Sequence, residues 1–293
     1  MWSEKIMGSD FYHVFYFLLI YSILGWIWEV FYVFLDTDKL VNRGFLNGPL
    51  CPIYGIGATM VYLFLSPIAD NLGLLYLGGV ILPTIVEYIT GAVMENLFHA
   101  SWWDYSDRKF NLKGRICLQV SIGWGLFSVV MVRVIHPLVY DIVEAIPYKV
   151  GIILASISFA CISSDLIITV SHVAKFNEKL EKLGKAKDEL RMRLENALIF
   201  ETKEEILLKL KLSENEYIEE LKERIAKFKE TNIEGIERIE QTFEETKERY
   251  SKYRNSIAKR NYTEKRLLTA FPQIKPLKNI DIFKEIMDKL NTK

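Results

Sequence analysis

Carboxylate side chains occur inside long apolar stretches of this sequence, where charged residues are unusual. Glu29, Glu87 and Asp165 each have mostly apolar neighbours on both sides. A charged side chain at membrane depth is costly, so such residues tend to face the interior of a helix bundle or a water-filled space. A carboxylate without a cationic partner is protonated there or holds a cationic group of a ligand. The sequence therefore predicts a polar site at membrane depth.

Further polar residues are expected at the same end of the predicted bundle. Together with the three acids they form a set of candidate substrate-binding residues: Glu29, Asn42, Arg43, Glu87, Glu95, Asp104, Tyr105, Arg115 and Asp165. We expect Glu87 and Glu95 to share one stripe of their helix. On the next helix we expect the inward stripe to hold Gln119, Gly123, Leu126, Val130 and Arg133. Glu–Arg pairing that only holds the bundle together is the alternative for each residue.

The sequence lacks the common motifs of enzymes and metal sites. Cys51, Cys117 and Cys161 show no C-x-x-C spacing and no neighbouring His, so we expect small buried residues and no metal. No G-x-x-x-x-G-K-S/T loop, G-x-S-x-G or H-E-x-x-H is present. We therefore expect no cofactor, leave catalytic residues unknown, and exclude ATP hydrolysis through a phosphate-binding loop.

The charged residues divide the chain into two unlike halves. Residues 1–174 hold 9 of the 37 basic and 13 of the 37 acidic residues. They contain five apolar stretches, which we predict as membrane spans: 11–35, 53–65, 74–98, 116–135 and 150–170. The prolines and glycines of 42–55 predict irregular or re-entrant backbone before the second span. His136-Pro137 is expected to end the fourth span.

The highly charged remainder is predicted to be helical. Apolar residues recur at three- and four-residue spacing with charged flanks, which is typical of a coiled coil. We predict a coiled-coil hairpin over 175–262, with a turn near Ser213; one long helix in a parallel homodimer is the alternative. Residues 263–293 are expected to form a tail in which 281–290 is a short amphipathic helix. The fold class is therefore all-α: a polytopic membrane helix bundle of about five spans with a long cytoplasmic helical hairpin.

Loop charges predict the orientation. Basic residues gather in the loops after the first and third spans and in the tail, and Lys/Arg-rich segments stay in the cytoplasm. We therefore expect a plasma-membrane protein with its N-terminus outside and its tail inside. Trp102 and Trp103 are expected to be anchors at the membrane surface. Nucleic-acid binding is not expected, because acids alternate with the bases of the tail.

Several long motifs carry a resemblance to a known family. They are FLLIYSILGW (17–26) with Glu29, NRGFLNGPLCPIYG (42–55), EYITGAVME (87–95), WWDYS (102–106) and NLKGRICL (111–118). Over residues 10–175 the sequence resembles the CmpB-like, type IV ABC-transporter permease family of bacterial multi-span membrane proteins. The resemblance implies a permease subunit that works with a separate ATPase, and it does not cover the tail.

Three functions stay open at this point. The first is a membrane transport component whose polar cavity opens to the cytoplasm. The second is an intramembrane enzyme acting on a lipid or isoprenoid phosphate, with Arg43 and Arg115 binding the phosphate and Glu29, Glu87 or Asp104 as acid or base. The third is a scaffold or sensor whose output is the coiled-coil tail. The lipid bilayer is a partner in all three.

Overall fold

The computed structural model describes residues 5–6, 9–196, 245–256, 261–271 and 274–276. These residues are mostly helical, as the sequence predicts. The chain divides into two compact units. The first holds 1–175 with 261–280 and 286–293, and the second holds 176–260 with 281–285. All candidate site residues belong to the first unit.

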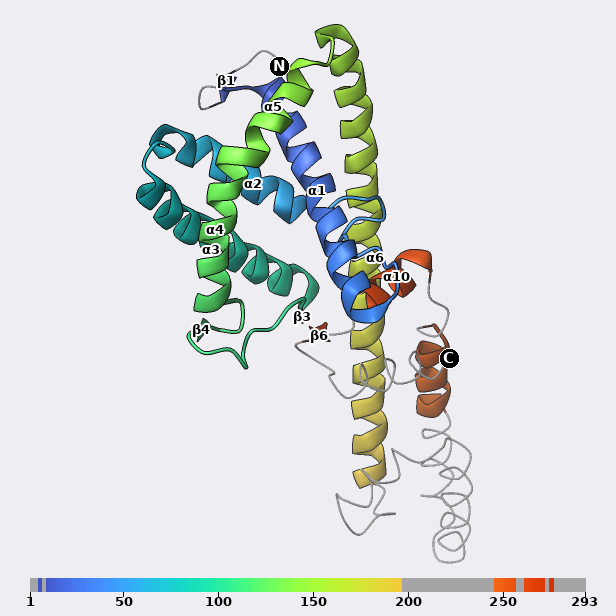
Figure 1. Cartoon of the computed structure of the whole chain (residues 1–293). Coiled ribbons are helices and arrows are strands. Elements are labelled where there is room, and N and C mark those ends of the chain that lie inside the picture. The colour runs from blue at the N-terminus through green and yellow to red at the C-terminus, as the bar shows by residue number, and fades with distance from the viewer. Residues whose placement is uncertain (1–4, 7–8, 197–244, 257–260, 272–273, 277–293) are drawn as a thin grey trace, which may run out of the picture. The chain divides into compact units, whose positions relative to one another are not determined.

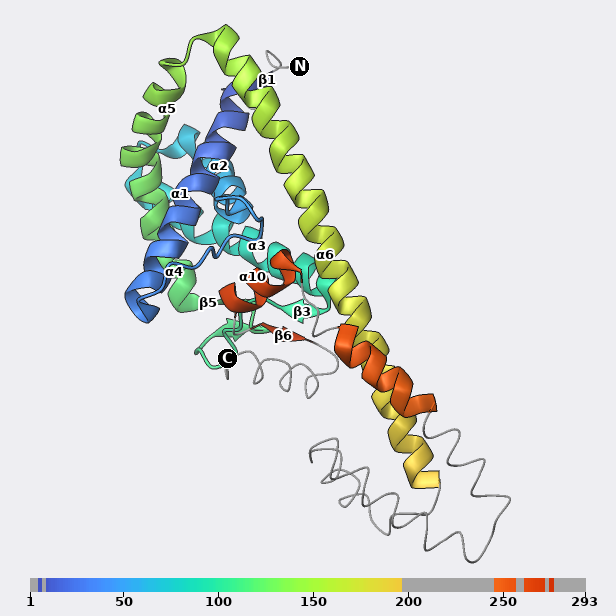
Figure 2. The same cartoon turned by 90° about the vertical axis from the view of Figure 1, so that its right-hand side faces the viewer.

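The helices and strands follow one another as Figures 1 and 2 show. The helices are α1 (Phe11–Thr37), α2 (Pro52–Leu65), η1 (Ser66–Ile68), α3 (Leu72–Phe98), α4 (Leu118–Val130), the π-helix η2 (Met131–Ile135), α5 (His136–Glu144), α6 (Tyr148–Asn196) and α10 (Tyr262–Ala270). The strands are β1 (Lys5–Ile6), β2 (Ser9–Asp10), β3 (Ala100–Ser101), β4 (Asn111–Leu112), β5 (Ile116–Cys117) and β6 (Lys275–Pro276). They form three antiparallel pairs, β1–β2, β3–β6 and β4–β5.

Four helices in the described part of the chain are long and apolar enough to cross a membrane. They are Phe11–Thr37, Leu72–Phe98, Leu118–Glu144 and Tyr148–Glu189. The predicted count of five is not confirmed, because α2 has only 14 residues. At 1.5 Å per residue α2 is about 21 Å long, whereas the hydrocarbon core of a bilayer is about 30 Å thick.

The two ends of α2 lie part of the way along the neighbouring helices α1 and α4–α5, not level with the ends of those helices. The amide of Cys51, just before α2, donates to the Ser22 carbonyl, 11 residues and about 16 Å into α1. At the other end, Arg133 donates to the Ala69 carbonyl in the α2–α3 turn at 2.6 Å. That turn thus lies about 16 Å short of Glu144, the end of α5. The backbone before α2 is irregular, as predicted.

Two glycines let α1 and α2 approach closely at this crossing. A Cβ at Gly25 would collide with the Tyr54 ring, and one at Gly55 would collide with Ser22 and the Leu18 carbonyl. Small residues at helix crossings allow such close backbone contact in membrane proteins. The crossing places Tyr54 beside the acidic part of α1.

The fourth predicted span, 116–135, does not end at His136-Pro137, so the prediction of its end is wrong. The helix continues to Glu144 through the π-turn of η2. A proline removes one backbone donor and crowds the preceding turn. A π-bulge absorbs such a break within a helix. Here Pro137 stands in the first turn of α5, where its missing N–H costs little.

The second unit is described only in part. Within it, the helical segment 245–256 contacts the end of α6 through Arg249 and Glu189, at 3.4 Å. Ser213 and residues 281–290 lie outside the described residues. The hairpin and the terminal amphipathic helix therefore stay predictions.

Candidate functional site

Glu29 on α1 lies at the first polar centre of the bundle. The Tyr54 hydroxyl of α2 donates to Glu29 Oε1 at 2.5 Å. Arg43 approaches Glu29 Oε2 at 3.7 Å, and both side chains are about one-quarter exposed. The Arg43 guanidinium also lies 5.7 Å from the centre of the Phe271 ring. Glu29 is thus bound to a phenol and only loosely paired with its cation.

Glu87 on α3 forms the second centre and is almost fully buried, with 7% exposure. The Tyr105 hydroxyl donates to its Oε1 at 3.1 Å, and the indole N–H of Trp124 donates to Oε2 at 3.0 Å. In the described part of the chain no basic side chain forms an ion pair with Glu87. The Glu87 carboxyl group is therefore held by two aromatic donors and has no ion-pair partner among the described residues.

Aromatic rings join the two carboxylates. The rings of Tyr54 and Trp124 lie 6.3 Å apart in an edge-to-face arrangement. Burial raises the pKa of the Tyr105 hydroxyl above its ordinary value of 10.0, and the carboxylates of Glu87 and Glu29 add to the rise. Tyr105 therefore stays a hydrogen-bond donor at neutral pH. We call Glu29, Arg43, Tyr54, Glu87, Tyr105 and Trp124 the carboxylate–aromatic site.

Asp165 and Asn42 have a different role, which is to hold the loop 42–50. Asp165 accepts hydrogen bonds from the backbone amides of Asn47 and Gly48 at 3.1 and 2.8 Å, and from the Asn47 side chain at 2.9 Å. Asn42 accepts from the Trp26 indole at 2.8 Å and donates to the Asn47 carbonyl at 2.9 Å. A carboxylate that accepts several backbone N–H groups stays ionised. These two residues therefore fix the loop that carries Arg43.

The helix α10 also binds this loop, a contact that no local sequence pattern predicts. Arg266, 8% exposed, donates to the carbonyls of Gly44, Phe45 and Asn42 at 2.7, 2.9 and 3.2 Å. Its Nε lies 3.4 Å from the Asn47 side-chain oxygen. Burial lowers the pKa of the Arg266 guanidinium. The chain after residue 260 thus returns to the membrane unit and fastens the Arg43 loop.

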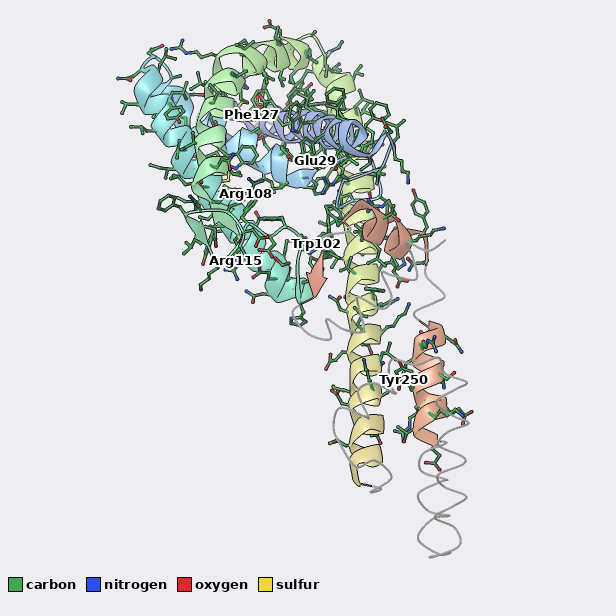
Figure 3. The ribbon with its side chains drawn as sticks, turned by 60° about the horizontal axis from the view of Figure 1, so that its bottom comes forward. Glu29, Trp102, Arg108, Arg115, Phe127 and Tyr250 are labelled. Carbon is green, nitrogen blue, oxygen red and sulfur yellow. The ribbon has the colours of Figure 1, made fainter. Side chains whose placement is uncertain are left out.

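Glu95 and Arg115 form a separate pair. Arg115 donates to Glu95 Oε2 from Nε at 2.9 Å and from Nη2 at 2.5 Å. Its guanidinium lies 5.2 Å from the Tyr88 ring centre. Arg115 lies well away from Glu29 in Figure 3. The pair holds the end of α3 to the loop before α4, which is the structural alternative that the sequence left open.

Asp104 caps a turn in the loop between α3 and α4. Its Oδ1 accepts from the backbone amide and the hydroxyl of Ser106, at 2.9 and 2.5 Å. Such a local bond is an Asx-type turn. Gly114, with φ of +68°, lies against it because a side chain there would collide with Asp104 and Ser106.

Two expectations about this region are wrong. Trp102 is not a surface anchor: it is 7% exposed and packs against Phe98, Phe45 and Phe271. Leu267 and Phe271 of the C-terminal segment cover Trp102, and a contact with so distant a segment cannot be predicted from the local sequence. The expected stripe of α4 and η2 faces outward: Gln119, Gly123, Leu126, Val130 and Arg133 are all exposed. Ser121, Gly125 and Ser128 are buried instead, because the Gly79–Gly125 contact sets the rotation of α4.

The structure adds three residues that sequence reasoning missed. Tyr54 and Trp124 lie in apolar stretches of the sequence, but the side chain of a tyrosine or tryptophan near a buried acid can donate a hydrogen bond to it. Arg266 lies in the predicted tail, 263–293. The signal for α10 was present in Asn261 and Glu264, which form a capping box. Across the described residues, no group of three or more His, Cys, Asp or Glu side chains is placed to hold a metal.

Comparison with known proteins identifies the family. No curated protein and no solved structure matches this chain. The family model described as "Putative ABC-transporter type IV", ABC_trans_CmpB, matches residues 15–170, more than half of the 293 residues. That range contains every residue of the carboxylate–aromatic site and excludes α10. The chain is therefore a membrane protein that belongs to the CmpB family of type IV ABC-transporter proteins.

Proposed function

We propose that this chain is the permease-like membrane component of a transport system, and that the carboxylate–aromatic site holds the transported group in a cavity open to the cytoplasm. The observation that carries the proposal is the charge balance of the site. Among the described residues, Glu29 has one ion-pair partner, the Arg43 guanidinium at 3.7 Å, and Glu87 has none. Such a site favours a proton or a cationic group.

The construction of the site suits alternating access. Its members come from α1, α2, α3, α4 and two loops, so any relative movement of the pair α2–α3 changes their spacing. Irregular backbone such as 42–51 is tolerated at membrane depth where it lines a protein-covered or watery space. Half-inserted helices meeting at polar sites are a recurrent feature of transporters.

The orientation follows from the same arrangement. The loops after α1 and α3 hold the basic residues, and Lys/Arg-rich loops face the cytoplasm. We infer that α2 and α3 either both cross the membrane or together enter and leave on one side, and either arrangement leaves an odd number of crossings. The N-terminus is then outside and the tail inside the cell.

Two experiments test the proposal together. The full chain is purified from its own membranes and examined for a co-purifying ATPase, because it has no phosphate-binding loop of its own. It is then reconstituted in liposomes with an entrapped pH dye and assayed for proton or cation movement. We expect Glu87→Gln to abolish the proton or cation movement. Ser156→Ala, at an exposed position of α6, should leave it intact. Absence of both an ATPase partner and any ion movement would reject this function.

The enzyme alternative loses support from the geometry. It requires Arg43 and Arg115 to bind one phosphate, yet two of the Arg115 nitrogens are already bonded to Glu95. One observation favours the sensor alternative: Arg266, which follows the predicted coiled-coil region 175–262, is hydrogen-bonded to the Arg43 loop. We therefore keep it as the second candidate: a tail that reports on, or controls, the membrane site. Deleting residues 175–293 tests it, since unchanged ion movement would exclude the tail as a controlling element.

A further inference from the structure

The loop between α3 and α4 contains an ordered hairpin that packs little of its own surface. Residues 107–117, here called the basic hairpin, fold back through the pairing of β4 with β5. The turn is closed by the Arg115 amide donating to the Leu112 carbonyl at 3.1 Å. Its central residues Lys113 and Gly114 have φ of +54° and +68°, which is typical of tight hairpin turns. The hairpin is thus a fixed shape, and the Tyr105 amide in the preceding part of the loop donates to its Gly114 carbonyl at 2.7 Å.

The tip of the basic hairpin presents large apolar side chains to its surroundings. Phe110 is 81% exposed and Leu112 is 53% exposed. Phe110 also has φ of +55°, a conformation that a bulky residue adopts only at some cost in free energy. A strained and almost fully exposed phenylalanine gains little from packing within the chain. Its position is therefore better explained by contact with something outside it.

Basic residues surround these apolar side chains. Arg108, Lys109 and Lys113 stand in the same short segment with one acid, Asp107, and all four are exposed. In the described part of the chain, no ion pair engages Lys109 or Lys113. The combination of free cations with exposed Phe and Leu is typical of surfaces that bind the headgroup region of anionic membranes.

The position of the basic hairpin fits this partner. It lies in the 19-residue segment between Phe98 and Leu118, the adjoining ends of two helices long enough to span a membrane. Figure 3 shows Arg108 and Arg115 at this end of the bundle, close to the start of α4. A hairpin so placed stays within reach of the bilayer surface. A soluble partner would have to compete with that surface for the same apolar tip.

We propose that the basic hairpin is an anionic-lipid-binding element: Phe110 and Leu112 enter the headgroup boundary of the cytoplasmic leaflet, while Arg108, Lys109 and Lys113 bind lipid phosphates. This binding surface is distinct from the carboxylate–aromatic site. It fastens the loop that supplies Tyr105 to that site. Lipid composition therefore acts on the position of Tyr105.

The test measures where residue 110 lies in a membrane. A Phe110→Cys variant of the full chain, in a Cys161→Ser background, is labelled with an environment-sensitive dye and placed in nanodiscs of phosphatidylcholine alone or with phosphatidylglycerol. Spin-labelled lipids then quench dyes that lie near the headgroups. Leu126→Cys, exposed on a span, serves as the membrane-embedded reference, and Tyr262→Cys, exposed on α10, as the reference in water.

We expect residue 110 to be quenched in the anionic nanodiscs and much less in the neutral ones. Lys109→Gln and Lys113→Gln should each weaken the preference for anionic lipid about fivefold. Quenching of residue 110 no greater than that of residue 262 in anionic nanodiscs would overturn the proposal, and a protein partner would become the better occupant. Equal quenching in neutral and anionic nanodiscs would overturn the assignment to anionic headgroups.

Discussion

Replacing Arg266 by Ala should release the Arg43 loop while leaving the helices of the bundle folded. The guanidinium donates three hydrogen bonds of 2.7 to 3.2 Å to backbone carbonyls of the loop. Hydrogen bonds from a charged donor contribute roughly 1.5–3 kcal/mol each before the cost of burying the charge. That burial cost offsets a large part of the sum. We estimate a net loss of about 3 kcal/mol, or about 150-fold in the docking equilibrium of α10.

Hydrogen exchange measured by mass spectrometry detects this change directly. The backbone amide of Gly44 donates to Asn42 within the loop, and those of Asn47 and Gly48 donate to Asp165 of α6. These three amides should exchange up to about 150-fold faster when α10 undocks and the loop is released. Arg266→Lys should give an intermediate effect, because lysine keeps the charge and loses the planar fork. Lys265→Ala is the matched control, since Lys265 is exposed on the same helix.

Unchanged exchange in the loop of Arg266→Ala would refute the reasoning, because the hydrogen bonds would then contribute nothing to docking. Equal acceleration in Lys265→Ala would refute it as well. In that case the loss of α10 helix stability, and not the loss of the guanidinium, would explain the effect.

Three further predictions follow from the contacts. Gly55→Val should prevent the α1–α2 crossing and abolish the folded membrane unit in a size-exclusion assay, whereas Gly57→Val, where a Cβ meets nothing, should behave as wild type. Asp165→Asn should lower stability by about 2 kcal/mol in thermal unfolding, because it removes the charge that holds two backbone amides of the 42–50 loop. Because the pKa of Tyr105 is raised, the stability from its hydrogen bond to Glu87 is fully present below pH 10 and is lost as the pH rises through the folded-state pKa. The melting temperature of the wild type should therefore fall at alkaline pH, and Tyr105→Phe should lack this part of the fall.

The sequence predicts the helices better than the site. Long apolar runs place both ends of α1 and α3, and the start of α6, within a few residues. The end of α6 at Asn196 lies well beyond the predicted span. Of the intramembrane acids that the sequence marks, Glu29 accepts a hydrogen bond from Tyr54 and Glu87 accepts one from Trp124. Their role in binding a substrate stays a prediction. Burial cost alone makes such residues visible in a sequence.

The parts that failed depend on contacts between distant segments. Helical periodicity gave the wrong face of α4, because tight packing at Gly125 and not average hydrophobicity sets its rotation. Arg266 reaches the 42–50 loop across more than 200 residues of chain, a pairing that no local pattern encodes. The same fold-back buries Trp102, which a membrane-anchor pattern had placed at the surface.

The central claim, a polar site open to the cytoplasm, is tested most directly by the accessibility of residue 29. Glu29→Cys in a Cys161→Ser background is treated with a membrane-impermeant thiol reagent in right-side-out and inside-out vesicles, with Asp141→Cys on α5 as the marker of the outer face. We predict that residue 29 reacts only in inside-out vesicles, whereas residue 141 reacts only in right-side-out ones. Reaction of residue 29 from the outer face, or from neither face, would contradict the account.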